Sequence, residues 1–137
     1  MRIQDSLEEG VSFYLAELQR LKHIVTQSRE FQDQADRRLV YLLDEILLGT
    51  NSQERHIAIV HVLGHLIANG AWGAISTHDL DLATSELIAD CCQVVHFRES
   101  FDDGQMTFDY RMRPGIATTT NALILMEMVG RDPPKES

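Results

Sequence analysis

The chain has 137 residues, 44% hydrophobic and 24% charged, which is the composition of a single soluble globular domain with a buried core. Twelve Lys and Arg against 21 Asp and Glu give a net charge of −9, which argues against a chain that binds nucleic acid through its overall charge. No apolar run approaches the ~18 residues of a membrane span, and no signal-peptide pattern is present. The only two cysteines, Cys91 and Cys92, are adjacent, which favours a reduced, cytoplasmic setting over a disulfide framework.

The first predicted element is an amphipathic helix that begins near Val11, after a turn-rich stretch over residues 1–10. Apolar residues recur in steps of three and four from Phe13 to Val25. Ser12 stands at the expected entrance of this helix. There it can either cap free backbone N–H groups or form half of an anion site, and by itself the pattern favours the cap.

The next element is an unbroken apolar run, Leu-Val-Tyr-Leu-Leu at residues 39–43, which ends at Asp44 and Glu45. A continuous run of this length predicts a strand buried on both faces, as in a parallel sheet flanked by helices. In such sheets the chemistry gathers beyond the carboxyl ends of the strands, where both acids are expected. The alternative is a strand that merely stops at a charged loop.

A second amphipathic helix is predicted over residues 54–68, with caps offered by Asn51 and Ser52. His61 and His65 are four residues apart on it, which is the spacing of two metal ligands on one helix face. No acid lies between them and no third ligand is obvious nearby. The pattern alone therefore favours two ordinary histidines over a metal site.

A short strand over residues 72–76 follows, and it stops just before His78. A strand–helix–strand unit would bring His78 to the same sheet edge as Asp44 and Glu45. A hydrogen-bonded loop histidine is the alternative.

The remaining chain predicts a helix, an antiparallel hairpin with an Asp-Gly turn, and a last helix whose Met and Leu residues are more typical of a core than of a cofactor site. The expected bounds are 80–89 for the first helix, 91–98 and 105–112 for the strands, and 121–129 for the last helix. Thr118–Thr120 can cap that helix, and the end of the chain is expected to be a flexible tail.

Four stretches, taken together and in order, resemble the C-terminal ATPase domain (domain V) of the MutS family of DNA mismatch-repair proteins. They are DSLEEGVSFYLAEL (residues 5–18), LLDEILLGTNS (42–52), STHDLDL (76–82) and FDYRMRPGIATTTNAL (108–123). The resemblance implies an α/β P-loop NTPase fold with an ABC-ATPase-like parallel core sheet and a C-terminal antiparallel hairpin. Residues 1–130 would be the C-terminal part of that domain, and residues 131–137 the tail.

The resemblance also implies roles for the polar residues at the strand ends. Asp44 matches the Walker B aspartate, which holds Mg²⁺ through water, and Glu45 matches the glutamate that orients the attacking water. His78 matches the histidine that senses the γ-phosphate of ATP. These roles suit phosphoryl transfer, which asks the protein mainly for positioning and charge neutralisation.

Two further positions match residues that act across a dimer. Ser12, after Gly10, matches the signature-loop serine that reaches the partner's nucleotide. Asn51 lies in the Gly-Thr-Asn loop that crosses the dimer contact, where a small residue lets backbones approach.

The chain also departs from the family pattern. No G-x-x-x-x-G-K-[ST] motif occurs in it, so the loop that cradles the phosphates of ATP is missing, and we expect the isolated chain neither to bind ATP well nor to hydrolyse it. Leu47-Leu48 replaces the usual Gly-Arg, and Glu54-Arg55 replaces the usual Asp-Gly, which indicates a MutS-like relative.

The leading hypothesis is therefore part of a MutS-like ATPase domain, whose full-length parent couples ATP hydrolysis to DNA binding and repair through its other domains. A sheet that lacks the core strand next to the phosphate-binding loop has an exposed edge strand. We therefore expect the chain to form a homodimer or to associate with the missing part of the domain. The alternative is a catalytically inactive module that keeps the fold for dimerisation or partner binding. A metal enzyme built on His61 and His65 is the remote third hypothesis.

Overall fold

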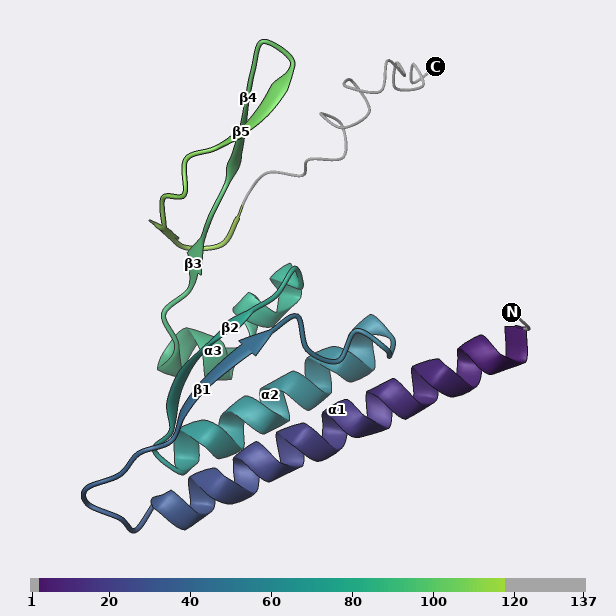
Figure 1. Ribbon diagram of the computed structural model, residues 1–137. Coiled ribbons are helices and arrows are strands. Elements are labelled where there is room, and N and C mark those ends of the chain that lie inside the picture. The colour runs from purple at the N-terminus through teal and green to yellow at the C-terminus, as the bar shows by residue number, and fades with distance from the viewer. Residues whose placement is uncertain (1–2, 118–137) are drawn as a thin grey trace. The chain divides into compact units, whose positions relative to one another are not determined.

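The computed structural model describes residues 3–117, and these divide after Cys92 into two compact units, residues 3–92 and 93–117 (Figure 1). The chain is a small α/β protein with short parallel and antiparallel sheets. The predicted caps at residues 118–120, the helix at 121–129 and the tail at 131–137 lie outside the described residues. Over the described part, no helix combines the length and the apolar character that crossing a membrane requires.

Helix α1 spans Ile3–Phe31, so it includes most of the stretch that was predicted to form turns. That prediction was wrong because the three- and four-residue apolar spacing extends back through Leu7, and Gly10 is tolerated inside the helix at a modest cost. Ser12 consequently lies in the interior of α1. It has no free helix N-terminus to cap, and no anion site of that kind forms there.

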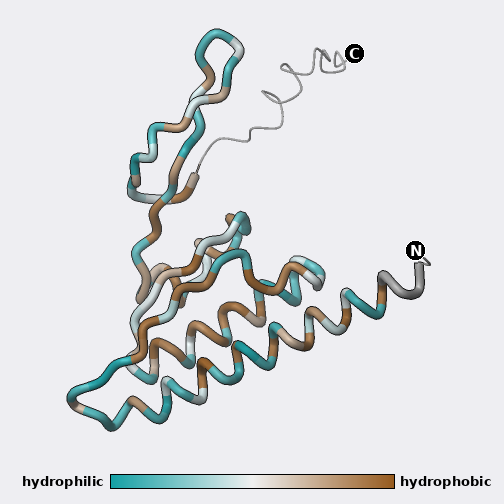
Figure 2. The backbone as a smooth tube through the Cα atoms, viewed as in Figure 1, coloured by the Kyte–Doolittle hydropathy of each residue, from teal (hydrophilic) through white to brown (hydrophobic). Residues whose placement is uncertain are grey.

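Strands β1 (Val40–Asp44) and β2 (Trp72–Ser76) pair in parallel, as predicted. Tyr41 and Leu43 are buried, whereas Val40 and Leu42 expose 67% and 81% of their surface. The predicted burial on both faces was therefore wrong within the described residues. Apolar side chains stand on both faces of the strand, and Figure 2 shows the hydrophobic colour along it. Among the described residues only the face of Tyr41 and Leu43 is packed.

Helix α2 (Ser52–Ala68) connects the two strands and agrees with its predicted bounds to within two residues. It buries Ile59, Leu63 and Leu66, and it packs against α1. The two helices run in the same direction, because α1 meets the loop before α2 near Gly10 and meets the end of α2 at Ser28. There the Asn69 side-chain amide donates to Ser28 Oγ over 2.9 Å.

The helix predicted over residues 80–89 is split into two short pieces. A 3₁₀ helix, η1, covers Leu80–Thr84, and α3 covers Glu86–Cys91, so the strand predicted to begin at residue 91 begins later. Ser85 has an extended backbone (φ −66°, ψ 144°) that separates the pieces. Ser85 is thus the N-cap residue of α3 by its backbone conformation, although its hydroxyl makes no capping hydrogen bond.

The second unit contains a hairpin at the predicted turn, with β4 (Glu99–Asp102) antiparallel to β5 (Gln105–Phe108). Its first strand was predicted at residues 91–98, and this was wrong, because the strand lies in the segment that was expected to connect the two strands. Asp103 and Gly104 form its two-residue turn, both with positive φ, as this turn chemistry requires. Within the predicted strand at 91–98 only β3 (Val95–His96) forms, and it pairs with β6 (Arg113–Pro114) and not with β5. The strand predicted over residues 105–112 ends earlier, at Phe108.

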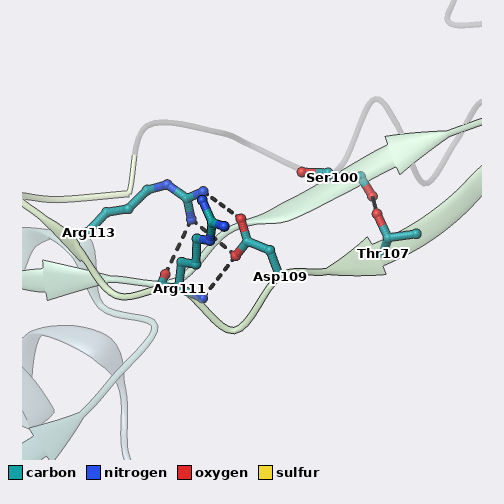
Figure 3. A network of polar contacts seen from close by, with 5 residues as sticks. All are labelled: Ser100, Thr107, Asp109, Arg111 and Arg113. Atoms are coloured by element: carbon teal, nitrogen blue, oxygen red, sulfur yellow. Dashed lines mark hydrogen bonds and ion pairs between the residues drawn. The ribbon is translucent and has the colours of Figure 1, made fainter.

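An ion pair closes the loop that follows β5 (Figure 3). Arg113 Nη1 and Nη2 donate to Asp109 Oδ1 and Oδ2, over 3.2 and 2.5 Å, and the Arg111 backbone N–H donates to Asp109 Oδ1 over 3.0 Å. These bonds hold the pKa of Asp109 well below its usual range, with the Arg113 side chain as the largest cause. In the hairpin beside it, Thr107 Oγ1 donates to the Ser100 carbonyl over 3.1 Å.

Candidate functional site

The carboxyl ends of β1 and β2 bring Asp44 and Ser76 into register as a facing pair. The Ser76 hydroxyl donates a hydrogen bond to Asp44 Oδ1. The ladder continues one residue further, because the Glu45 backbone N–H donates to the Ser76 carbonyl over 3.1 Å. Parallel pairing thus places the carboxylate of Asp44 at the exposed carboxyl end of the sheet, here called the β1–β2 edge, next to the Ser76 hydroxyl.

Glu45 and His78 meet just beyond this pair. His78 Nε2 lies 3.3 Å from Glu45 Oε1, and the His78 side chain is 95% exposed. Asp44, Glu45 and His78 therefore lie together at the carboxyl ends of β1 and β2, as the sequence predicted. Their roles are a separate question. The exposed imidazole has room to turn away from Glu45 towards a ligand.

The loop that leaves β1 has an unusual backbone. Glu45 and Leu47 have φ angles of 47° and 60°, a region that residues other than glycine adopt only when their surroundings hold them there. Glu17 of α1 supplies part of that support, since its Oε1 accepts from the Leu47 backbone N–H over 2.8 Å. Leu47 itself is fully buried.

The turn that carries His78 is anchored in a similar way. The Asp79 backbone N–H donates to Thr77 Oγ1 over 3.0 Å, and Asp79 Oδ2 lies 3.7 Å from His56 Nδ1 on α2. Asp79 Oδ1 also accepts from the Asp81 backbone N–H over 3.2 Å, which caps η1. Short-range bonds therefore fix the backbone beside His78, while its side chain is exposed and contacts Glu45.

The other predicted site residues have different positions. Asn51 is the N-cap of α2, and its side chain accepts from the Glu54 backbone N–H over 2.9 Å, as the sequence predicted. Gly10 and Ser12 are exposed on α1. The Gly10 carbonyl lies 3.8 Å from the point where a Cβ on Gly49 would stand, so this part of α1 borders the Gly-Thr-Asn loop.

The side chains of Asp44, Glu45 and Ser76 offer oxygen atoms at this edge. Oxygen ligands suit a hard cation such as Mg²⁺ held partly through water. Asp44 and Glu45 are the residues that would face such an ion. Within residues 3–117, no group of three or more His, Cys, Asp or Glu side chains is arranged to hold a metal ion without other ligands.

Two contributing residues were not assigned a role from the sequence. Ser76 could have been found from strand register, because two five-residue strands that begin together also end together at Asp44 and Ser76. Glu17 could not, since its contact with Leu47 depends on how α1 packs against the loop after β1.

No protein-family model matches the chain. The chain is 27% identical over 128 residues to a protein named DNA mismatch repair protein MutS 2 from Haloarcula marismortui. The match covers 92% of this chain and 13% of that protein, so the chain spans only a small part of its relative's length. This similarity supports a relationship between the chain and MutS-related proteins.

Proposed function

We propose that this chain is part of a MutS-like ATPase domain and that its β1–β2 edge forms the metal- and water-binding side of an ATP site. The observation that carries the proposal is the convergence of Asp44, Glu45 and His78 at the ends of two parallel strands. The similarity to MutS 2 supports the same choice. The finer assignment, an ABC-ATPase-like P-loop fold corresponding to domain V, is part of this proposal.

Each residue of the edge has a distinct task in ATP hydrolysis. Asp44 would hold hydrated Mg²⁺, which neutralises phosphate charge, and Ser76 orients the Asp44 carboxylate. Glu45 would accept a hydrogen bond from the attacking water, in line with the terminal phosphate. His78 would leave Glu45 and donate to the γ-phosphate, because its ring is 95% exposed and contacts the protein through Glu45.

The remaining phosphate contacts belong to other segments in this proposal. A glycine-rich loop with a lysine is absent from the sequence, so the chain alone would bind ATP poorly. Gly10 and Ser12, both exposed on α1, would contact the nucleotide of a second copy across a dimer. Asn51 would serve mainly as the cap that holds the adjoining loop at this contact.

The biological role that follows is ATP binding and hydrolysis coupled to DNA binding and repair. We propose that the DNA contacts lie in other parts of a longer protein, because a net charge of −9 does not favour binding of the phosphate backbone. The cytoplasm, with its ATP and its reduced thiols, is the compartment we propose.

Steady-state ATP hydrolysis tests this function in a protein that joins the present chain to the segment encoded upstream of it. We expect an upstream phosphate-binding loop in frame, and Mg²⁺-dependent turnover that Asp44→Asn and His78→Ala each reduce by about 10²-fold or more. Asp90→Asn, a change at an exposed acid on α3, is the matched control. Turnover unaffected by either site substitution would contradict the proposal.

A second candidate function is a catalytically inactive dimerisation module, favoured by the unpacked face of the β1–β2 sheet. Val40, Leu42 and Trp72 lie on this face and are at least 65% exposed. Exposed apolar faces with free strand edges are typical association sites.

A second copy of the chain fits this face because its charges are self-complementary. Arg38 lies at one end, with its guanidinium carbon 5.1 Å from the centroid of the Trp72 ring. Asp44 lies at the other end of the same face, by the alternation of β1. A two-fold axis across the middle of β1, level with Tyr41, would set Arg38 of each copy near Asp44 of the other.

Sedimentation equilibrium of the chain over a range of concentrations tests this arrangement. We expect a dimer, its loss in Leu42→Glu, and its retention in Ile57→Glu, a control at an exposed residue of α2. Arg38→Asp should weaken the dimer, and adding Asp44→Arg should restore it. A wild-type chain that stays monomeric throughout would exclude the module.

A further inference from the structure

Two histidines on α2 approach each other through the same ring atom. His61 Nε2 and His65 Nε2 lie 3.2 Å apart, and the two rings meet edge to face at 85° with their centroids 4.7 Å apart. Both side chains are exposed. The i, i+4 spacing explains why they share a helix face, but the convergence of the two Nε2 atoms is additional information that spacing alone does not provide.

The distance between these atoms agrees with a shared metal ion. Imidazole nitrogens lie about 2.0–2.1 Å from Zn²⁺, so two of them at tetrahedral or right-angle positions are about 2.9–3.4 Å apart. The observed 3.2 Å lies within this interval. We propose that His61 and His65 form a two-ligand site for a divalent late transition-metal ion, a site separate from the ATP edge and independent of its function.

The ligand chemistry selects the class of ion. Neutral imidazole suits Zn²⁺, Ni²⁺ and Cu²⁺, whereas Mg²⁺ and Ca²⁺ require oxygen ligands that this pair does not offer. At equal ligand number the order of affinity is Cu²⁺ first, with Ni²⁺ and Zn²⁺ weaker. Water would fill the remaining coordination positions of the ion.

The helix supports a cation at this position. His65 lies in the last turn of α2, where the helix dipole favours positive charge. Without metal, one Nε2–H donates to the other Nε2, so the rings are already close to their binding positions. Binding requires a shift of that proton to Nδ1 and little movement of the side chains.

Isothermal titration of the full chain with NiCl₂ and CuCl₂ tests the site. Cys91 and Cys92 are free thiols that would also bind these ions, so every protein in the series carries Cys91→Ser and Cys92→Ser. We expect one ion per chain, with Cu²⁺ bound more tightly than Ni²⁺. His61→Ala and His65→Ala should each weaken binding by about tenfold or more, because one of two ligands is lost.

His23→Ala is the matched control, since it removes an exposed histidine of α1 and should leave the affinity unchanged. Electron paramagnetic resonance of the Cu²⁺ complex provides a second measurement. Splitting from two imidazole nitrogens is expected in the parent and from one in either single variant. Equal affinity in the parent, both single variants and the double variant would overturn the site, as would a Cu²⁺ spectrum unchanged by the substitutions.

Discussion

His78 Nε2 lies 3.3 Å from Glu45 Oε1, although the whole of α2 separates these residues along the chain. The contact exists because α2 returns the chain to the start of a parallel strand, and β2 then ends level with β1. The same return sets Ser76 against Asp44. A strand–helix–strand unit thus gathers an acid, a second acid and an imidazole at one edge, which is the arrangement the proposed ATPase requires.

The close approach of β2 to Tyr41 predicts that a side chain at Gly73 destabilises the fold. A Cβ at Gly73 would stand 2.2 Å from the Tyr41 carbonyl oxygen and 2.4 Å from its ring, so Gly73→Ala must push the strands or the ring apart. We expect it to lower the free energy of unfolding by about 1–3 kcal/mol, measured by urea denaturation. The buried position of Tyr41, which also raises the pKa of its phenol, leaves the ring little room to yield.

Gly64→Ala is the matched control. A Cβ at Gly64 would meet only Leu87 Cδ2 at 3.7 Å, an ordinary contact, and alanine is the better helix former by about 0.5–1 kcal/mol. The two glycine substitutions should therefore change stability in opposite directions. Equal effects would show that the strands do not approach at Gly73 as described.

Glu17 is expected to hold the loop that follows Glu45. Glu17→Ala removes the acceptor of the buried Leu47 N–H, at a cost of about 1–3 kcal/mol, whereas Glu17→Gln keeps an oxygen in place. Hydrogen exchange measured at the Leu47 amide should accelerate in Glu17→Ala and much less in Glu17→Gln. Glu9→Ala, at an exposed residue of the same helix, should leave that exchange rate unchanged; acceleration there too would indicate general loosening of α1.

The Asp109–Arg113 pair makes the second unit sensitive to acid. Because folding lowers the pKa of Asp109 from its ordinary value of 3.8, the pair contributes stability above about pH 4, and this contribution is lost as the pH falls towards the lowered value. Carboxyl ¹³C NMR should show Asp109 titrating below its ordinary value. In Arg113→Ala the midpoint should rise towards 3.8, and an unchanged midpoint would exclude Arg113 as the main cause.

The sequence predicted most of the strand–helix–strand unit. Strand β2 was predicted with its observed bounds, α2 to within two residues, and the Asp103-Gly104 turn was correctly located, because each depends on local apolar spacing or turn chemistry. The three residues at the strand ends could be placed for the same reason. Their roles in catalysis stay proposals.

The errors arose where residues distant in the sequence determine burial or contact, or where two local patterns compete. Burial of Leu42 depends on what covers its face of the sheet, and an apolar side chain alone does not supply that information. The start of α1 was misplaced because Asp5, Ser6 and Gly10 indicate a turn locally, while the apolar spacing that continues through Leu7 favours a helix. The contact between Glu17 and Leu47 joins two elements that the sequence does not relate.

The most direct test of the proposed ATP site is a comparison of nucleotide binding with turnover in Glu45→Gln, made in the protein that includes the upstream segment. Glutamine keeps the shape of Glu45 but cannot accept the proton of the attacking water, so hydrolysis should fall by about 10²–10⁴-fold while Mg²⁺-dependent ATP binding persists. Glu54→Gln, at the first turn of α2, is the control. Trapped, unhydrolysed ATP is the result we predict, and undiminished hydrolysis in Glu45→Gln would contradict the account.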